Sequence, residues 1–166
     1  MDGQEGSQPP VSEMRAWAYR LLGQREYSVA ELGQRLRLKW PGPESGPESG
    51  QGSGPGSDGV GELLDALVAE NLLSDKRFTE SFVRSHIQRQ HGPLKIRAAL
   101  RAKGVADALI AAELDRHIDA WADLAAQWLE RRHSGPLDYA SRGKFYRRLL
   151  NRGFTHEQAM VALARD

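Results

Sequence analysis

Apolar residues recur three or four positions apart along most of the chain, which is the spacing of an amphipathic α-helix. In the segment 92–105, "GPLKIRAALRAKGV", Ile96 and Leu100 share one helical face. Proline suits the first turn of a helix, and a glycine that adopts a positive φ ends many helices. The sequence therefore predicts a short helix that begins at Pro93 and ends at Gly104.

A second segment near the C-terminus repeats this pattern at an offset of about fifty residues. The matched pairs are Leu100 and Leu149, Lys103 and Arg152, Gly104 and Gly153, Val105 and Phe154, Ile110 and Ala159, and Leu114 and Leu163. Leu36 and Lys39 match the first two positions once a gap is allowed. Such self-similarity predicts an all-α fold of tandem three-helix units that form an elongated, curved stack.

The helical pattern and its start signals divide the chain into three such units. We expect units at 12–73, 74–116 and 117–166. The expected helices are 12–23, 28–39, 60–71, 76–90, a helix from Pro93 to Gly104, 105–115, 119–132, 138–151 and 155–164. Ser12, Ser28, Asp75 and Thr155 are the expected N-caps, with Glu31 completing a capping box after Ser28.

Two stretches have the composition of disordered segments. Residues 1–11 form an expected N-terminal tail, and residues 41–59 contain no aromatic or aliphatic side chain and repeat the unit GPES. Such a composition buries too little apolar surface to offset the entropy of ordering, which predicts a flexible linker inside the first unit. A phosphate-binding loop is excluded because Phe145 follows the one Gly143-Lys144 pair, where that motif requires serine or threonine.

Composition argues against chemistry at this chain's own residues. The chain has no cysteine, no apolar run long enough to span a membrane and no signal-peptide pattern, so we expect a cytoplasmic location. His86 and His91 lie five residues apart across a helix break, which is not metal-ligand spacing. Asp75 has no base or nucleophile at a diagnostic spacing, so helix capping explains it better than catalysis. We expect no enzyme activity, no metal and no cofactor.

Charge is segregated, although the formal net charge is only +1. Every ionised side chain from Arg84 to Lys103 is basic, and Asp138 is the one acid between Arg131 and Arg152. Two basic segments in matching positions of two repeats can face acidic protein or phosphates. The predicted partner-binding residues are Arg84, Arg89, Lys95, Arg97, Arg101, Lys103, Arg142, Lys144, Arg147, Arg148 and Arg152.

Four segments carry a specific combination of motifs: "REYSVAEL" (25–32), "LVAENLLSDKRFTESFVRSHI" (67–87), "HGPLKIRAALRAKGV" (91–105) and "RRLLNRGFTHEQAMVAL" (147–163). Together they resemble the RecX family, bacterial regulators of the recombinase RecA. The resemblance implies tandem three-helix repeats and a monomer that lodges in the groove of the RecA filament on single-stranded DNA. It also implies inhibition of ATP hydrolysis, strand exchange and filament growth. The insertion at 41–59 departs from the short turn usual in the family.

Two other classes of protein fit parts of the pattern. Short helix triplets are also the shape of a helix-turn-helix DNA reader, but the basic helices lack the Asn and Gln side chains commonly used to read bases. A helical-repeat adaptor for another acidic partner fits the periodicity equally well, and only the family motifs disfavour it. Base stacking by Trp40 or Tyr146 is a weaker alternative to a structural role.

Overall fold

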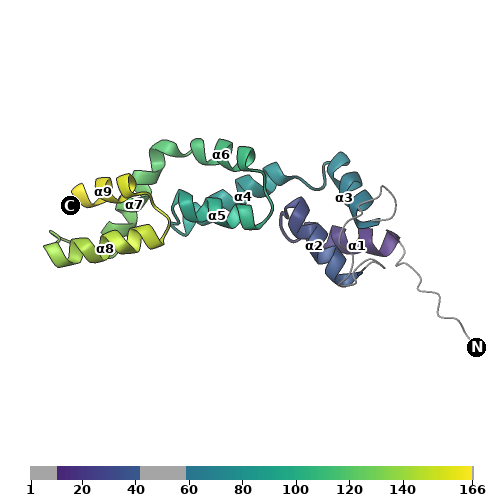
Figure 1. Cartoon of the computed structure of the whole chain (residues 1–166), viewed down its shortest axis with the longest axis horizontal. Helices are drawn as coiled ribbons and strands as arrows, with labels where there is room; N and C mark the ends of the chain where they lie inside the picture. The colour runs from purple at the N-terminus through teal and green to yellow at the C-terminus, as the bar shows by residue number, and fades with distance from the viewer. Residues whose placement is uncertain (1–10, 42–58, 166) are drawn as a thin grey trace, which may run out of the picture. The chain divides into compact units, whose positions relative to one another are not determined.

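The computed structural model describes residues 11–41 and 59–165, and all regular structure in these residues is helical (Figure 1). The all-α prediction is therefore confirmed. The chain divides into two compact units between Phe78 and Thr79, inside one helix. Most of the predicted linker and tail lies outside the described residues. The helices are α1 (Val11–Leu22), α2 (Val29–Lys39), α3 (Gly59–Ala69), α4 (Asp75–Gln88), α5 (Pro93–Ala102), α6 (Asp107–Asp115), the 3₁₀ turn η1 (Ile118–Ala120), α7 (Trp121–Glu130), α8 (Tyr139–Asn151) and α9 (His156–Ala164).

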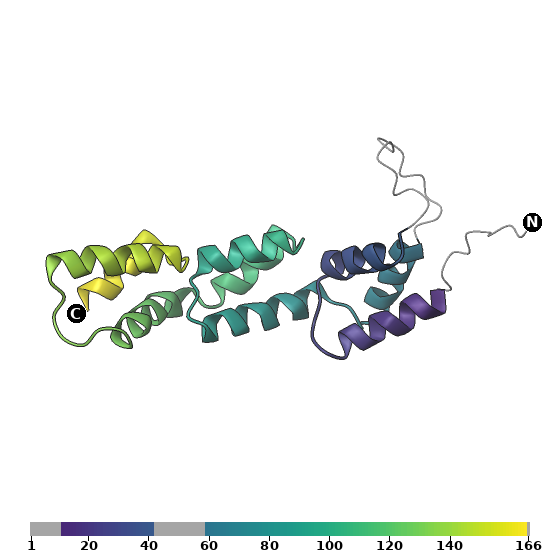
Figure 2. The same cartoon turned by 90° about the horizontal axis from the view of Figure 1, so that it is seen from below.

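The first unit packs α1, α2 and α3 around one core (Figure 2). Met14 and Ala18 of α1 are buried against Leu32 and Leu36 of α2 and Leu67 of α3. Trp17 and Trp40 pack on the edge of this core with their rings perpendicular and 5.5 Å apart, which favours a structural role for Trp40. The three helices therefore share one hydrophobic cluster.

Two of the four predicted caps are confirmed and two are wrong. The Ser28 and Thr155 hydroxyls accept from the third N–H of α2 and α9, and Thr155 forms a full capping box with Gln158. Ser12 is instead the second residue of α1.

Asp75 is the other incorrect cap. It is the first residue of α4, and Ser74 takes the capping position, where its hydroxyl accepts from Arg77 N–H. The Asp75 carboxylate accepts from the Val29 N–H at 2.8 Å, so it caps the first turn of α2 from 46 residues away. Asp75 therefore links α4 to the start of α2 and is not the N-cap of its own helix.

The second unit holds its last helices together through a core of α7, α8 and α9. Trp128 and Leu129 of α7 meet Phe145 and Leu149 of α8, and Leu163 of α9 joins them. The residues matched by the repeat are each buried at their own place in the chain: Leu36, Leu100 and Leu149 are each 0% exposed. The helical periodicity therefore located the core correctly.

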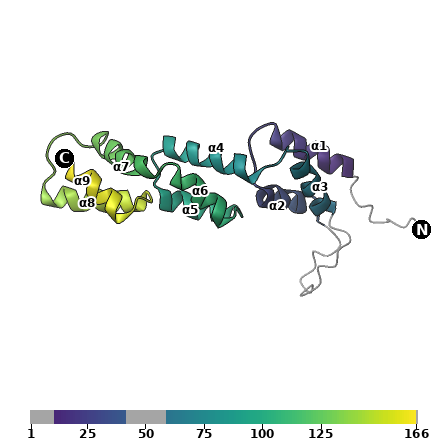
Figure 3. The ribbon, with the colours of Figure 1, turned by 90° about the horizontal axis from the view of Figure 1, so that it is seen from above.

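Within the second unit, the C-terminal turn of α8 lies against the N-terminal turn of α5 (Figure 3). The Gly92 N–H donates to the Arg152 carbonyl at 2.8 Å, and the Leu94 N–H donates to the Gly153 carbonyl at 2.9 Å. Two orphan carbonyls of one helix end thereby satisfy two N–H groups at the start of another. We call this contact the α8–α5 seam.

Truncating the matched core leucines should destabilise the fold strongly. We expect Leu100→Ala and Leu149→Ala each to lower the free energy of unfolding by about 2 to 5 kcal/mol, because each removes methyl groups from a closely packed site. Leu94→Ala, on an exposed position of the same helix as Leu100, should change it by less than about 0.5 kcal/mol. Urea unfolding followed by circular dichroism measures all three. Equal midpoints for Leu100→Ala and Leu94→Ala would contradict the repeat alignment.

Candidate functional site

Six of the predicted partner-binding side chains form no salt bridge with a carboxylate of the described residues. Arg84 and Arg89 lie on and just after the C-terminal half of α4, Lys95 and Arg97 lie on α5, and the set ends on α8 with Lys144 and Arg147. All are exposed except Arg97, which is half-buried. Their charge is therefore directed to solvent and to whatever binds there.

Arg148 is the seventh cation of this group, and it is exposed. It lies on α8, and its guanidinium carbon is 5.7 Å from the centre of the Phe145 ring. This cation–π contact positions the side chain without neutralising its charge. We call the seven cations Arg84, Arg89, Lys95, Arg97, Lys144, Arg147 and Arg148 the basic surface.

Arg101 and Arg142, two other predicted residues, have partners inside the protein. Arg101 forms a salt bridge with Asp107, with Nε and Oδ1 at 2.6 Å, and this contact lowers the pKa of Asp107. Arg142 donates to the Leu163 carbonyl at 2.9 Å and so caps the end of α9. These internal contacts account for the charge of Arg101 and the hydrogen bonding of Arg142, so neither arginine requires a partner molecule. Lys103 is half-buried at the end of α5.

Arg152 is the most engaged of the predicted residues. Its Nε donates to the Gln90 carbonyl at 3.0 Å and its Nη2 to the Arg89 carbonyl at 2.6 Å, 62 and 63 residues away in sequence. Its guanidinium also lies 5.5 Å from the Trp128 ring centre. Burial, and then the charge of Arg132, lower the pKa of Arg152. Arg152 thus joins the end of α8 to the turn before α5, and the charge of Arg132 lies near it.

Arg132 is a neighbour that the sequence places in a basic segment without assigning it to the site. Its guanidinium lies 4.6 Å from the Trp128 ring centre, and its Nη1 donates to the Trp128 carbonyl at 3.2 Å. The signal that would have found it is the spacing of four residues from Trp128 at the end of a helix. Two guanidinium groups therefore converge on one indole.

The two histidines of the α4–α5 turn form a hydrogen-bonded pair. The Nδ1 atoms of His86 and His91 are 2.9 Å apart, and the His86 ring stacks on Phe82 at 4.1 Å. Among the described residues, no group of three or more potential metal ligands occurs. Burial, followed by the charge of Lys95, lowers the pKa of His91 to about 4, so both rings are neutral near pH 7.

This histidine pair predicts that stability falls in acid. The pKa of His91 is about 4 in the folded state and about 6.5 unfolded, so protons bind the unfolded chain first as pH drops. Stability is complete above about pH 6.5, and because solvent screening reduces the effect on a partly exposed ring, we expect a loss of about 1 to 2 kcal/mol between there and pH 4.

The His91→Gln variant isolates this contribution, because the other titrating groups are common to both proteins. Its urea-unfolding free energy, measured from pH 7 to pH 4, should depend less steeply on pH than that of the wild type. Parallel profiles for the two proteins would show that His91 does not cause the acid sensitivity.

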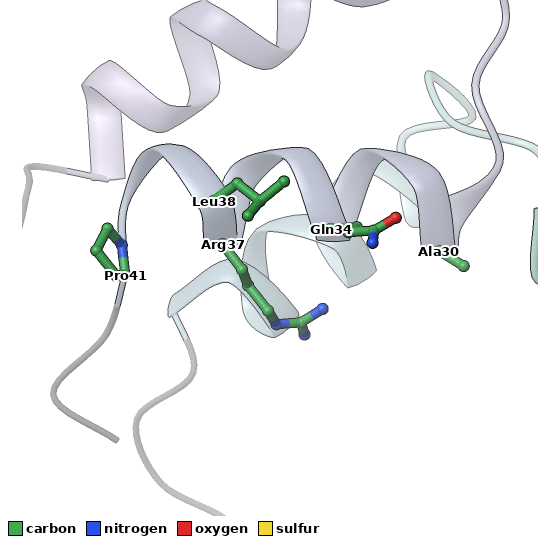
Figure 4. A pocket seen from close by; sticks show the side chains of 5 residues that line it. All are labelled: Ala30, Gln34, Arg37, Leu38 and Pro41. Atoms are coloured by element: carbon green, nitrogen blue, oxygen red, sulfur yellow. The ribbon is translucent and has the colours of Figure 1, made fainter. Parts of the chain in front are cut away.

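A separate hollow of about 490 Å³ lies on the outer face of α2 in the first unit (Figure 4). Ala30, Gln34, Arg37 and Leu38 of α2 line it, together with Pro41 just after the helix. The lining offers one cation and no carboxylate, so it does not provide a pair of groups for acid–base chemistry.

None of the helices in the described part of the chain combines the length and the apolarity required to cross a bilayer. The described helices have the arrangement of a helical-repeat protein, and several of them carry exposed cations. Stacked repeats of this kind form extended surfaces that bind partners. Residues 74–114 match the family model described as "RecX, second three-helix domain".

Curated relatives extend this match over nearly the whole chain. The regulatory protein RecX of Chromohalobacter salexigens is 40% identical over 148 residues, covering 89% of this chain and 88% of that protein. The regulatory protein RecX of Halorhodospira halophila is 37% identical over 154 residues, covering 91% and 86%. The chain belongs to the RecX family of regulatory proteins.

The fold agrees with solved structures of this family. The crystal structure of RecX from Lactobacillus salivarius superposes with a TM-score of 0.73 at 21% identity, covering 93% of this chain and 95% of that one. A second crystal structure of a regulatory protein RecX gives a TM-score of 0.67 at 22% identity, covering 94% and 74%. The helical-repeat architecture is thus common to all three chains.

Proposed function

We propose that this protein binds the RecA filament on single-stranded DNA and inhibits its ATP hydrolysis, strand exchange and growth. It acts as a cytoplasmic monomer built from three-helix units at 12–73, 74–116 and 117–166, and it performs no chemistry of its own. A ligand that binds one filament state more tightly than another shifts the populations by that difference in affinity.

The observation that carries the proposal is the basic surface of a chain from the RecX family. Its seven cations form no salt bridge with the carboxylates of the described residues, so their potential extends into solvent. A RecA filament on DNA offers two kinds of anion, acidic protein side chains and phosphates. We place the filament contact on α4, α5 and α8, and leave Arg101, Arg142 and Arg152 to their internal partners.

Co-sedimentation with RecA filaments tests the binding step. Filaments assembled on single-stranded DNA with a non-hydrolysable ATP analogue should carry the protein into the pellet. The amount bound should fall as salt is raised, because screening weakens exposed charge pairs. RecA without DNA, and DNA without RecA, are the two controls that assign the binding to the filament.

The rate of ATP hydrolysis by RecA on single-stranded DNA tests the inhibitory step. The rate should fall as the protein is added. A protein that stays in the supernatant and leaves the ATPase rate unchanged would contradict the proposal. Retention on a specific duplex against bulk competitor DNA, without RecA, would instead indicate the helix-turn-helix class.

A further inference from the structure

The region where Arg132 and Arg152 converge contains buried N–H groups that have no acceptor. Trp128 is 3% exposed and its Nε1 has no hydrogen-bond partner among the described residues. Gln90 is 7% exposed and its Nε2 is likewise unpaired. A buried polar group without a partner costs about 1 to 3 kcal/mol, so two of them in one region require an explanation.

Both unpaired donors belong to residues that Arg152 contacts directly. Arg152 donates to the Gln90 carbonyl and lies 5.5 Å from the centre of the Trp128 ring. Arg132 lies 4.6 Å from the same ring. Gln90 has a φ of 55° in the turn that ends α4, where the His91 N–H donates to the His86 carbonyl, and its own carbonyl accepts from Arg152.

Charge in this region is uncompensated. Neither Arg132 nor Arg152 forms a salt bridge with a carboxylate of the described residues. Burial, and then the charge of Arg132, lower the pKa of Arg152, and the two guanidinium groups lie 4.6 and 5.5 Å from the centre of the Trp128 ring. Two guanidinium groups thus lie near the Trp128 ring, and neither has a carboxylate partner among the described residues.

We propose that this cluster is a binding site for a single phosphate group. Guanidinium groups match phosphate oxygens in a two-pronged geometry, and one phosphate has enough acceptors for two such groups and further N–H donors. Arg132 is exposed and its long side chain can rotate off the indole to admit the ligand. The phosphate is a free ion or part of a nucleic-acid backbone, and the titrations below separate these sources.

The indole signal of Trp128 provides the test. The chain contains four tryptophans, so ¹⁵N-labelled protein shows few indole Nε1–H peaks, and Trp128→Phe identifies one by its loss. On titration with inorganic phosphate this peak should shift and saturate. Sodium chloride at the same ionic strength should not reproduce the shift.

Two neighbouring arginines supply a matched pair of variants. Arg132→Gln removes a cation that touches Trp128, whereas Arg131→Gln removes an adjacent exposed cation with the same change in net charge. We expect phosphate affinity to fall about tenfold in Arg132→Gln and to remain near wild type in Arg131→Gln. Equal responses in the two variants, or an equal response to chloride, would overturn the site.

Different ligands then identify the source of the phosphate. A short single-stranded oligonucleotide that shifts the Trp128 peak at lower phosphate concentration than the free ion indicates a backbone phosphate. A response to the free ion alone indicates a small anion, and a response only to an acidic peptide would overturn the phosphate assignment. Because no titration contains RecA, this site and the proposed filament inhibition can fail independently.

Discussion

We expect Gly92→Ala to lower the free energy of unfolding by about 3 kcal/mol or more, because the added methyl group has no room at the α8–α5 seam. A Cβ added to Gly92 would lie 2.3 Å from the carbonyl carbon of Gly153 and from the nitrogen of Phe154. Both neighbours are backbone atoms, so no side chain can rotate away. The α8–α5 seam must open, and inserted atoms in a packed site cost about 1 to 3 kcal/mol before any hydrogen bonds are lost.

Gly153→Ala should act in the same direction from the other side of the seam. Its added Cβ would lie 2.4 Å from the Lys95 Cβ and 2.5 Å from the Lys95 nitrogen, and Gly153 also has a φ of 89°. A side chain in that left-handed region adds about 1 kcal/mol of strain. Both variants should also lose the two hydrogen bonds that join Gly92 and Leu94 to α8.

Gly143→Ala is the matched control within α8. Apart from the backbone of its own helix, no heavy atom of the described residues lies within 4 Å of its added Cβ, and alanine favours the helix, so this variant should gain about 0.5 to 1 kcal/mol. Urea unfolding compares the three glycine variants directly. If Gly92→Ala is as stable as Gly143→Ala, the close backbone approach at the seam is not a feature of the protein in solution.

Features governed by near neighbours in sequence could be predicted. Pro93 begins α5, Gly104 has a φ of 74° at its end, and the Thr155 hydroxyl binds an N–H three residues on. Each follows from the covalent geometry of one or two residues. Leu100 and Leu149 are buried because helical periodicity places them on the apolar face.

Features governed by distant partners could not be predicted in the same way. Asp75 binds an N–H 46 residues away, and Arg152 binds carbonyls 62 and 63 residues away. Composition identifies such a side chain as charged, but the fold decides whether its partner is internal. The start of the helix at Pro93 follows from its own residues, whereas the contact of Gly92 with Gly153 depends on how two distant helix ends pack.

Some predicted binding residues are bonded inside the protein, whereas the cations of the basic surface form no salt bridge with a carboxylate of the described residues. The sharpest test of function therefore changes cations of the basic surface. Lys144→Glu combined with Arg147→Glu reverses two exposed charges of α8 that form no salt bridge with a carboxylate of the described residues. Glutamate is nearly as good a helix former as lysine or arginine, and both positions precede the last turn of the helix, where an acid would oppose the macrodipole. We therefore expect the fold to be retained and filament binding to be lost.

The expected loss of inhibition is at least about tenfold in the concentration needed to halve RecA's ATPase rate at low salt, because two attractive contacts become repulsive. The difference from wild type should shrink as salt is raised, since screening weakens attraction and repulsion alike. Arg20→Glu combined with Lys76→Glu makes the same change in net charge on exposed residues of the first unit and should inhibit nearly as well as wild type. Circular dichroism checks the fold of each variant. If the α8 variant is folded and inhibits like this control, Lys144 and Arg147 do not contact the filament. The filament contact must then be sought on other residues.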